Sequence, residues 1–436
     1  MRLYGKNNKD CIVYNDDIEQ DAISQIISIL DTKAFKDVPV RIMPDVHLGK
    51  GIVIGFSAPL TDMVNPTHVG VDIGCSITLC VVNRAITEKD IPLIEHRIKK
   101  DIPMGFDIHK NRVFEMKDFI KFLNIEYNKA RSTWPEMVND ITISEDYLSK
   151  MLKRIGMDEG VFYKSLGTLG GGNHFIEIGS LSGNYTFAVH CGSRNFGLKV
   201  CKYWETIANT PSFDKDLFKE RVKELKNTIK DKTMIPAKIE EIRQDMLNAN
   251  VPNGYLSGVD MSDYISDMVI AQAYAKFNHH IITKRIEDIF KKINGGKVID
   301  TVQSIHNYID MNDHIIRKGA IRSYENERML VPFNMRDGIA ICVGKSNPDW
   351  NYSCSHGAGR KFSRSQAKKM FTMEEYKESM EGIYSTSVNH STLDESPMAY
   401  KDTDTIIGLI GDTCDIIELV RPIINIKAAD ISPADD

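Results

Sequence analysis

The succession of strand-like and helix-like segments is the feature of this sequence that most restricts its fold. Short apolar runs, rich in β-branched residues and punctuated by Gly and Pro, lie at residues 38–43, 51–56, 77–82, 164–188 and 338–343. Helix-like segments lie between the early runs and the late one. Strands towards both ends of the chain with helices inserted between them are typical of an α+β domain and not of a repeated βαβ unit.

Two helices are predicted in the inserted block. One apolar stripe on a charged helix is formed by Phe218, Val222, Leu225 and Ile229. A second helix is expected to begin at an N-cap at Ser262-Asp263 and to stop at Gly295-Gly296. We therefore expect one domain over residues 1–436 with a strand-rich core, a helical insertion at about 205–295 and a frayed acidic tail at 428–436.

Net charge gives no sign of a dedicated nucleic-acid binder. The 436 residues include 55 basic and 60 acidic side chains, a formal charge of −5. A strongly basic chain would bind nucleic acid by releasing counterions, so here any such contact must come from a local basic patch. The first residues lack the apolar segment of a signal peptide, and no stretch reaches about 18 apolar residues. We therefore expect a cytoplasmic protein that does not enter a membrane.

Cysteine usage argues against a disulfide scaffold. The eight cysteines include no CxxC pair, and most are expected to be small buried hydrophobic residues. Cys75 is the exception, because Asp72 stands three residues before it between two glycines. A carboxylate and a thiolate so close together could bind one or two metal ions, although an Asp-x-x-Cys segment is also an ordinary turn.

Four further segments each place one histidine in a strand-like or glycine-rich setting. Their histidines are His174, His190, His306 and His356. A single histidine on an apolar strand is usually a hydrogen-bonded core residue. Three such imidazoles together with Asp72 and Cys75 would instead provide a site for one or two metal ions, with nitrogen, oxygen and sulfur ligands.

His356 differs from the other three histidines because small residues surround it. Gly357-Ala358-Gly359 follows it, and Arg360 comes next, with Arg364 one turn further if a helix starts here. Small neighbours allow a phosphate to approach the imidazole, and arginine can stabilise that phosphate. The segment fits a covalent nucleophile, and a histidine held at the start of a helix is the alternative.

Two more segments carry groups suited to catalysis. Within MPDVHLGKG, the carboxylate of Asp45, the imidazole of His47 and the amine of Lys50 stand beside two glycines. This pattern suits either a catalytic loop or a hairpin turn with solvated charges. Arg194 follows Gly192-Ser193 in a polar turn, where it could hold a phosphate or lie on the surface.

Taken together and in this order, these segments resemble the RtcB family of RNA-splicing ligases from about residue 40 to 427. The matching pieces are MPDVHLGKG, GVDIGC, SLGTLGGGNHFIEI, VHCGSRNFG, HNY, RKGA, SHGAGRKFSR, DESPMAYKD and RPIINIK. Each piece is ordinary alone, but their joint occurrence in this order is specific. The resemblance implies a GTP- and Mn-dependent ligase that joins RNA 3′-phosphate or 2′,3′-cyclic phosphate ends to 5′-hydroxyl ends, in RNA repair or tRNA splicing.

The resemblance also implies roles for single residues. It implies two manganese ions bridged by Cys75, with Asp72 and His174 on one ion and His190 and His306 on the other. It implies that His356 becomes guanylylated and that Asp45 and Arg194 lie on the RNA side. The residues implied to contact the nucleotide are Asn173, His174, Glu177, His356, Gly357, Ala358, Gly359, Tyr400 and Lys427. An activating partner, the family's archease, is a further expectation.

Three segments depart from the family pattern. Residues 332–338 read PFNMRDG where the family tends to read PGSMG. Gly197-Leu198-Lys199 stands in place of Gly-His-Gln, and Ala428 follows Lys427 in place of Gly. These departures fall where the nucleotide and the RNA should bind, so we expect a divergent branch of the family.

Two other functions fit parts of the pattern. A dinuclear metal-dependent phosphoesterase would use the same Asp, Cys and His ligands, but it has no need of His356 among small residues. A catalytically inactive RNA-binding relative would keep the metal as a structural ion, although such a protein has no physical reason to keep an oxidisable thiolate site. A nucleotide adduct on His356 would separate a ligase from both.

Overall fold

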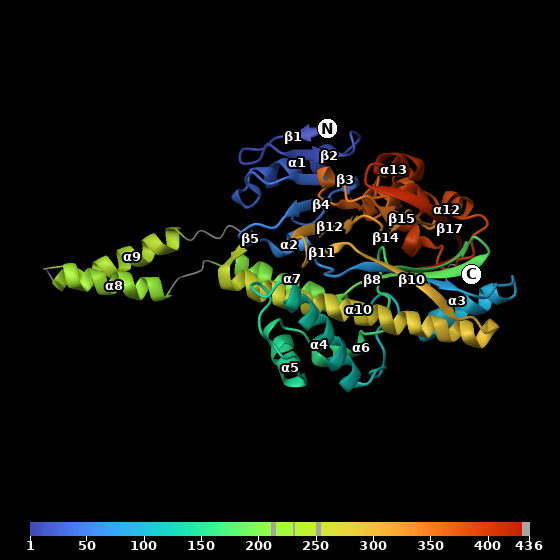
Figure 1. Cartoon of the computed structure of the whole chain (residues 1–436), viewed down its shortest axis with the longest axis horizontal. Helices are drawn as coiled ribbons and strands as arrows, with labels where there is room; N and C mark the ends of the chain where they lie inside the picture. The colour runs from blue at the N-terminus through green and yellow to red at the C-terminus, as the bar shows by residue number, and fades with distance from the viewer. Residues whose placement is uncertain (211–214, 230–231, 250–253, 430–436) are drawn as a thin grey trace.

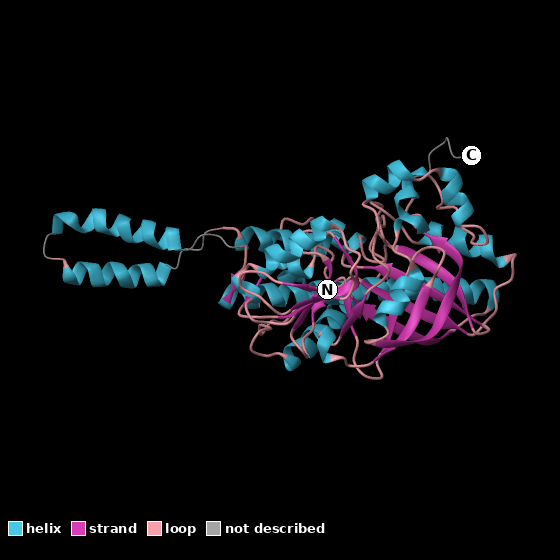
Figure 2. Ribbon diagram, turned by 90° about the horizontal axis from the view of Figure 1, so that it is seen from above, coloured by secondary structure: helices cyan, strands magenta, loops and turns pink. Residues whose placement is uncertain are grey.

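Two large β-sheets form the centre of the protein, and helices cover their outer faces (Figures 1 and 2). The computed structural model describes residues 1–210, 215–229, 232–249 and 254–429. The seven-stranded sheet has the order β10 (Val298–Ile305), β6 (Ser76–Val82), β8 (Asn184–Cys191), β7 (Phe175–Leu181), β17 (Cys414–Ile426), β15 (Ile339–Gly344) and β14 (Arg328–Pro332). The six-stranded sheet has the order β1 (Arg2–Leu3), β2 (Cys11–Val13), β3 (Val40–His47), β4 (Ile54–Pro59), β12 (Ile315–Lys318) and β11 (Asn307–Ile309).

The seven-stranded sheet is antiparallel throughout and curls until its two edges meet. The backbone N–H of Leu330 on β14 donates to Ser304 Oγ on β10 at 2.9 Å. Arg328 and Asp300 form an ion pair of 2.5 Å across the same seam. Alternate residues of the strands point to the inside and form an apolar interior: Ile77, Leu79, Val81, Leu181, Ala188, Val302, Leu330, Ile339, Ile341 and Val420. The sheet is therefore a nearly closed barrel.

The long helix α10 (Gly258–Asn294) packs along the outer face of this barrel (Figure 1). Its Ile282, Ile286 and Phe290 share an apolar cluster with Val82 and with α3 (Asp90–Asp101). Gly295 ends the helix in the left-handed region at φ 73°, as its position predicts. The helix begins at Gly258 after an N-cap at Ser257, so the predicted start at Ser262-Asp263 is wrong by about one turn. The apolar pattern continues through that point, and Met261 is buried.

More of the chain is helical than the apolar pattern predicts. Four helices that we did not predict connect β6 to β7: α3, α4 (Met116–Thr133), α5 (Glu145–Arg154) and α6 (Glu159–Lys164). The strand-like run expected from residue 164 begins as a strand only at Phe175, because α6 and a glycine-rich loop precede it. The remaining helices are α1 (Gln20–Leu30), α2 (Pro66–Val69), α7 (Arg194–Ala208), α11 (Arg364–Met370), α12 (Met373–Ser379) and α13 (Thr403–Ile410). None of the helices in the described part of the chain combines the length and apolar character that a membrane span requires.

Helices α8 (Lys215–Thr228) and α9 (Ile235–Ala249) form a hairpin that extends away from the body (Figures 1 and 2). Of the predicted stripe, Phe218, Val222 and Leu225 lie on α8, whereas Ile229 follows the last residue of that helix. No described residue of the two helices belongs to an apolar cluster of the body. The tail residues 430–436, part of the expected frayed segment, lie outside the described residues.

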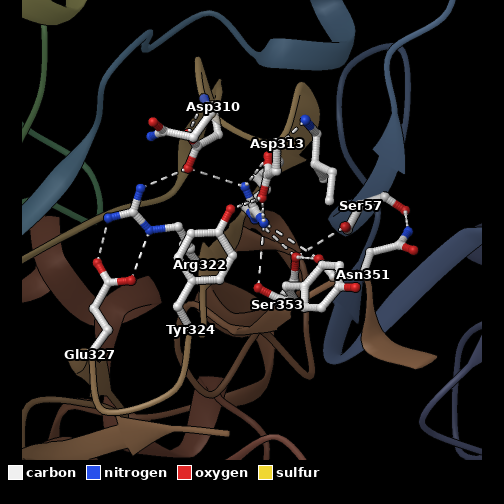
Figure 3. A network of polar contacts seen from close by, with 12 residues as sticks. Ser57, Asp310, Asp313, Arg322, Tyr324, Glu327, Asn351 and Ser353 are labelled. Atoms are coloured by element: carbon white, nitrogen blue, oxygen red, sulfur yellow. Dashed lines mark hydrogen bonds and ion pairs between the residues drawn. The ribbon is translucent and has the colours of Figure 1, made fainter. Parts of the chain in front are cut away.

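A buried ionic network fixes the strand that leads to His356 (Figure 3). The two-stranded sheet of β13 (Ala320–Arg322) and β16 (Ser353–Ser355) stands next to the fully buried Arg317. Arg317 donates to Ser353 Oγ at 2.9 Å and forms an ion pair with Asp313 at 2.6 Å. Figure 3 also shows Arg322 held between Asp310 and Glu327. Because a buried guanidinium needs all its partners, the network restricts the position of β16.

Candidate active site

One end of the barrel gathers the five residues expected to bind metal. Every second residue of the barrel strands points into the barrel. The same alternation continues beyond the apolar residues to this end of the barrel. His190 is two residues beyond Ala188 on β8 and lies opposite Ile77, whereas Cys75 is two residues before Ile77. His306 directly follows β10. A period of two residues therefore turns Cys75, His190 and His306 towards the same point.

Short contacts link all five of these side chains. Cys75 Sγ lies 3.3 Å from His190 Nε2 and 3.6 Å from His174 Nε2. His174 Nε2 lies 3.0 Å from Asp72 Oδ2, and His190 Nε2 lies 3.3 Å from His306 Nε2. The ligand atoms of Cys75, His174 and His190 all lie within 4.8 Å of one another. The structure thus brings together every predicted metal ligand.

The chemistry of these donors fits a cation. His190 Nδ1 lies 3.1 Å from the carbonyl oxygen of Asn173, so Nδ1 carries the proton and the lone pair on Nε2 points to Cys75 and His306. Burial, and then the neighbouring imidazoles, lower the pKa values of His190 and His306 well below the usual range. Neutral imidazoles, a carboxylate and a thiol whose lone pairs converge form a set that a metal ion would satisfy.

Asp72 is held in its ionised form. Burial would raise its pKa, but the hydrogen bonds from His174 and Cys75 and the charge of Arg194 together outweigh burial and lower the pKa of Asp72 to about 2. The backbone N–H of Ser193 donates to Asp72 Oδ1 at 2.9 Å. A Cβ atom at Gly192 would lie 2.2 Å from Asp72 Oδ1, so this carboxylate can approach only a glycine.

His356 lies beside this cluster and is oriented by Asp45. The His356 and His306 ring centroids are 4.9 Å apart. His356 Nδ1 lies 2.6 Å from Asp45 Oδ2, and the same oxygen accepts from the His356 backbone N–H at 3.1 Å. Asp45 is fully buried and belongs to β3, so the predicted catalytic loop or hairpin turn is wrong for this residue. A carboxylate bound to Nδ1 leaves Nε2 as the nucleophilic nitrogen.

A cavity of about 410 Å³ opens in front of His356. Most of the residues expected to contact the nucleotide line it: Asn173, Glu177, His356, Gly357, Ala358, Gly359, Tyr400 and Lys427. The small residues after His356 are needed, since a Cβ at Gly359 (φ 75°) would lie 2.1 Å from the Asp45 carbonyl oxygen. No helix starts at Arg360; the next helix, α11, begins at Arg364 after an N-cap at Ser363.

Glu395, which the sequence did not single out, contacts four of the residues that line this cavity. Its carboxylate accepts from Lys427 Nζ at 2.9 Å and Tyr400 Oη at 2.6 Å and pairs with Arg360 at 3.2 Å and Arg364 at 2.6 Å. Burial would raise the pKa of Glu395, but the three cations outweigh burial and lower it to about 2. Glu395 belongs to the segment DESPMAYKD, which is one of the pieces that match the family. Its position in the same short segment as Tyr400 is the sequence signal that could have identified it.

The pKa of Glu177 is shifted in the opposite direction to that of Glu395. Its carboxyl lies on the inner face of β7 and accepts from Asn425 Nδ2 at 3.1 Å. Burial raises the pKa of Glu177 to about 8, and this hydrogen bond and the charge of Lys427 offset burial only in part. The second carboxyl oxygen, Oε1, has no hydrogen-bond partner among the described residues. A buried acid with an unused oxygen in a ligand-sized cavity is typical of a site that completes its hydrogen bonds with a ligand.

Arg194 occupies the first position of helix α7 and not a turn, with φ 56°. Its guanidinium donates to Thr168 Oγ1 at 3.0 Å and to the Gly105 carbonyl oxygen at 2.9 Å. The divergent residues 332–338 close the turn between β14 and β15. Within them, Phe333 and Met335 are buried and line the cavity, and Asp337 pairs with Arg336 at 2.7 Å.

Comparison with known proteins shows the family of the chain. The family model for tRNA-splicing ligase RtcB matches residues 32–428. The RNA-splicing ligase RtcB of Escherichia coli K12 is 28% identical, and the alignment covers 94% of this chain and 95% of that protein. The tRNA-splicing ligase RtcB of Aeropyrum pernix is 25% identical over 84% of this chain and 82% of its own. The RNA-splicing ligase RtcB of Mycobacterium tuberculosis is 24% identical over 84% and 90%. The chain therefore belongs to the RtcB family.

Proposed function

We propose that this RNA ligase of the RtcB family uses GTP and manganese to join RNA 3′-phosphate or 2′,3′-cyclic phosphate ends to 5′-hydroxyl ends. The observation that carries the proposal is the position of His356. Its imidazole is oriented by a buried carboxylate, faces a ligand-sized cavity and lies next to a cluster of metal-binding side chains. A hydrolase could use the cluster alone, whereas this histidine has the surroundings of a nucleophile.

The first step would transfer GMP to His356. Nε2 attacks the α-phosphorus of GTP, an N–P bond forms, and the bond to the bridging oxygen breaks so that pyrophosphate leaves. Asp45 keeps the proton on Nδ1 and stabilises the positive charge that develops on the ring. The phosphates would be surrounded by the positive side chains of Arg360, Arg364 and Lys427. Ion pairs with Glu395 hold these three side chains in place.

The metal ions would be held by Asp72, Cys75, His174, His190 and His306. When bound, they supply Lewis-acid stabilisation of charge on phosphate oxygens. In the unliganded protein, Glu177 is poised to donate a hydrogen bond at neutral pH because it retains its proton. Its unused Oε1 therefore suits a purine acceptor or a ribose oxygen.

The later steps would transfer GMP from His356 to the RNA and then join the two RNA ends. An oxygen of the RNA 3′-phosphate attacks the phosphorus of the His356 adduct, and Nε2 leaves as a neutral imidazole. The 5′-hydroxyl of the second end then attacks the 3′-phosphorus, its proton passes to the phosphate of the leaving GMP, and a 3′,5′-phosphodiester forms as the bond to GMP breaks. We place the enzyme in the cytoplasm, where thiols such as Cys75 remain reduced, and expect archease to accelerate guanylylation.

The test is covalent labelling with GTP that carries a radioactive α-phosphate. We expect Mn²⁺-dependent label on the denatured wild type, no label on His356→Ala, and wild-type labelling of the control His96→Ala, which changes an exposed histidine. Labelled ATP in place of GTP measures how the divergent 332–338 segment affects base choice. Equal labelling of His356→Ala would refute the mechanism, and phosphate release from RNA without an adduct would indicate a phosphoesterase.

A further inference from the structure

A second and larger groove, of about 1080 Å³, opens beside the nucleotide cavity. Its lining residues come from the loop 103–107, from Gly171-Gly172, and from α11, α12 and the segment 386–395. The groove shares Arg364 and Lys427 with the nucleotide cavity. The two spaces are therefore neighbours, and a chain lying in the groove would come close to the nucleotide cavity.

The groove has a surplus of positive charge although the whole chain is acidic. Its lining includes five cationic side chains, Lys99, Arg364, Lys368, Lys377 and Lys427, against three acidic ones, Asp107, Asp394 and Glu395. The surplus is two positive charges, in a chain of net charge −5. Lys377 is exposed, and its ammonium group makes no hydrogen bond or ion pair with any described residue. Lys99 pairs with Glu95 at 3.7 Å and Lys368 with Asp394 at 3.3 Å, so Lys377 is the most available of the three for a phosphate. The groove thus offers a local positive site to a nucleic-acid ligand in an acidic protein.

Phe106 stands at the rim of the same groove and is fully exposed, at 105% of the reference area. Its loop is held by hydrogen bonds: the Gly105 N–H donates to the Gly170 carbonyl oxygen at 2.9 Å, and the Leu169 N–H donates to the Pro103 carbonyl oxygen at 2.9 Å. Arg194 also donates to the Gly105 carbonyl oxygen. An aromatic ring that a well-braced loop presents to water is suited to stack on a flat ligand.

We infer that this groove binds single-stranded RNA next to the joined end, with a base stacked on Phe106 and phosphates contacted by Lys377, Lys368 and Lys99. The inference rests on the proposed ligase function, because it takes RNA as the substrate. Proteins that bind single strands without sequence preference combine aromatic stacking with positive charge. A protein partner would be a poorer match, because the groove borders the nucleotide cavity and is lined by more cations than anions.

The first experiment measures the affinity of a short fluorescent single-stranded RNA with a 3′-phosphate by anisotropy over a range of salt concentrations. Loss of the stacking ring in Phe106→Ala is expected to weaken binding about tenfold, and Phe106→Trp is expected to retain it. Lys377→Ala is expected to lower the slope of log Kd against log salt by about 0.7, the value for one phosphate on a single strand. The matched controls on α4, Ile125→Ala and Lys117→Ala, change exposed residues outside the groove and should bind like wild type.

The second experiment uses Phe106→Trp as a reporter. Base stacking should quench the added indole when RNA is titrated, relative to the wild type with its three tryptophans. Wild-type affinity of both Phe106→Ala and Lys377→Ala, together with an unquenched Trp at position 106, would overturn the inference. Normal labelling of His356 in that case would leave the proposed function standing, whereas failure of wild-type labelling would overturn the function itself.

Discussion

Buried charges around the site are each balanced by a specific partner. Asp45 is covered completely and binds His356, and Glu395 is surrounded by Lys427, Arg360 and Arg364. Such groups lower stability if one partner is lost, because the remaining charge stays buried. Removal of one partner should therefore destabilise the fold as well as change the chemistry of the site.

Removal of the charge on Asp45 tests its part in activating His356. Asp45→Asn keeps the size of the side chain but weakens the preference for a proton on Nδ1, so we expect the rate of GMP transfer to fall by about 100-fold or more. The measurement is the initial rate of labelling from GTP at saturating Mn²⁺. Unchanged metal binding would show that the cluster is intact, and a wild-type labelling rate would contradict the role of Asp45.

Glu177 predicts a pH dependence of stability. Its pKa is raised from 4.5 to about 8 in the folded protein, so between these values the folded state binds a proton that the unfolded state releases. The free energy of unfolding should therefore fall as pH rises through this window, by up to about 1.4 kcal/mol per pH unit from this group. Glu177→Gln removes the titration.

The measurement is urea unfolding of wild type and Glu177→Gln without metal or nucleotide. The stability of the variant relative to wild type should increase between about pH 6 and about pH 8. Asn425→Ala serves as a comparison, since it removes the hydrogen bond to Glu177 and should strengthen the wild-type pH dependence. A difference between wild type and Glu177→Gln that does not change with pH would mean that Glu177 is ionised when folded.

Individual elements contribute to the site in different ways. The strands β6, β8 and β10 place ligands through their alternation, whereas α10 supports the barrel from outside. The hairpin of α8 and α9 does neither, because no described residue of it joins the core of the body. The residues of the body that precede and follow the hairpin lie close together. A Cβ at Gly254 would lie 3.6 Å from Asn209 Oδ1.

The hairpin should accordingly be removable. Replacement of residues 211–253 by a short Gly/Ser linker is expected to leave the melting temperature within a few degrees of wild type and GMP labelling within about twofold, because the connected ends are already neighbours. Labelling and a thermal melt of the shortened chain provide the measurements. A folded shortened protein that no longer labels would show that the hairpin takes part in guanylylation.

At the scale of the whole protein, the metal ligands tie together segments far apart in the chain. Cys75 and His190 are 115 residues apart and His190 and His306 are 116 apart, yet their side chains touch. An ion that binds only the folded protein stabilises the entire barrel by mass action.

Mn²⁺ should therefore raise the melting temperature of the protein. At about 100 times its Kd the ion adds about 2.7 kcal/mol, which corresponds to a shift of several degrees, and a chelator should reverse it. His190→Ala should lose the shift, whereas His96→Ala, an exposed histidine on α3, should keep it. An equal shift in wild type and His190→Ala would place the ion elsewhere.

Local patterns in the sequence account for a defined part of this protein. Short apolar runs rich in β-branched residues predict the strands that become β3, β6 and β15, and Gly295 marks the end of α10. The kinds of side chain near Cys75 and His356 indicate metal binding and nucleophilic chemistry. These features are readable because they depend on residues a few positions apart.

The tertiary structure alone decides the rest. Asp45 and His356 are 311 residues apart, and nothing local to either predicts their hydrogen bond. The interactions of Glu395 and the closure of the barrel likewise depend on strand register and on packing between distant segments. Residue chemistry determined which groups were available to the site. The long-range pairing of strands determined which of them meet, because register is set by the packing of whole faces and not by neighbours along the chain.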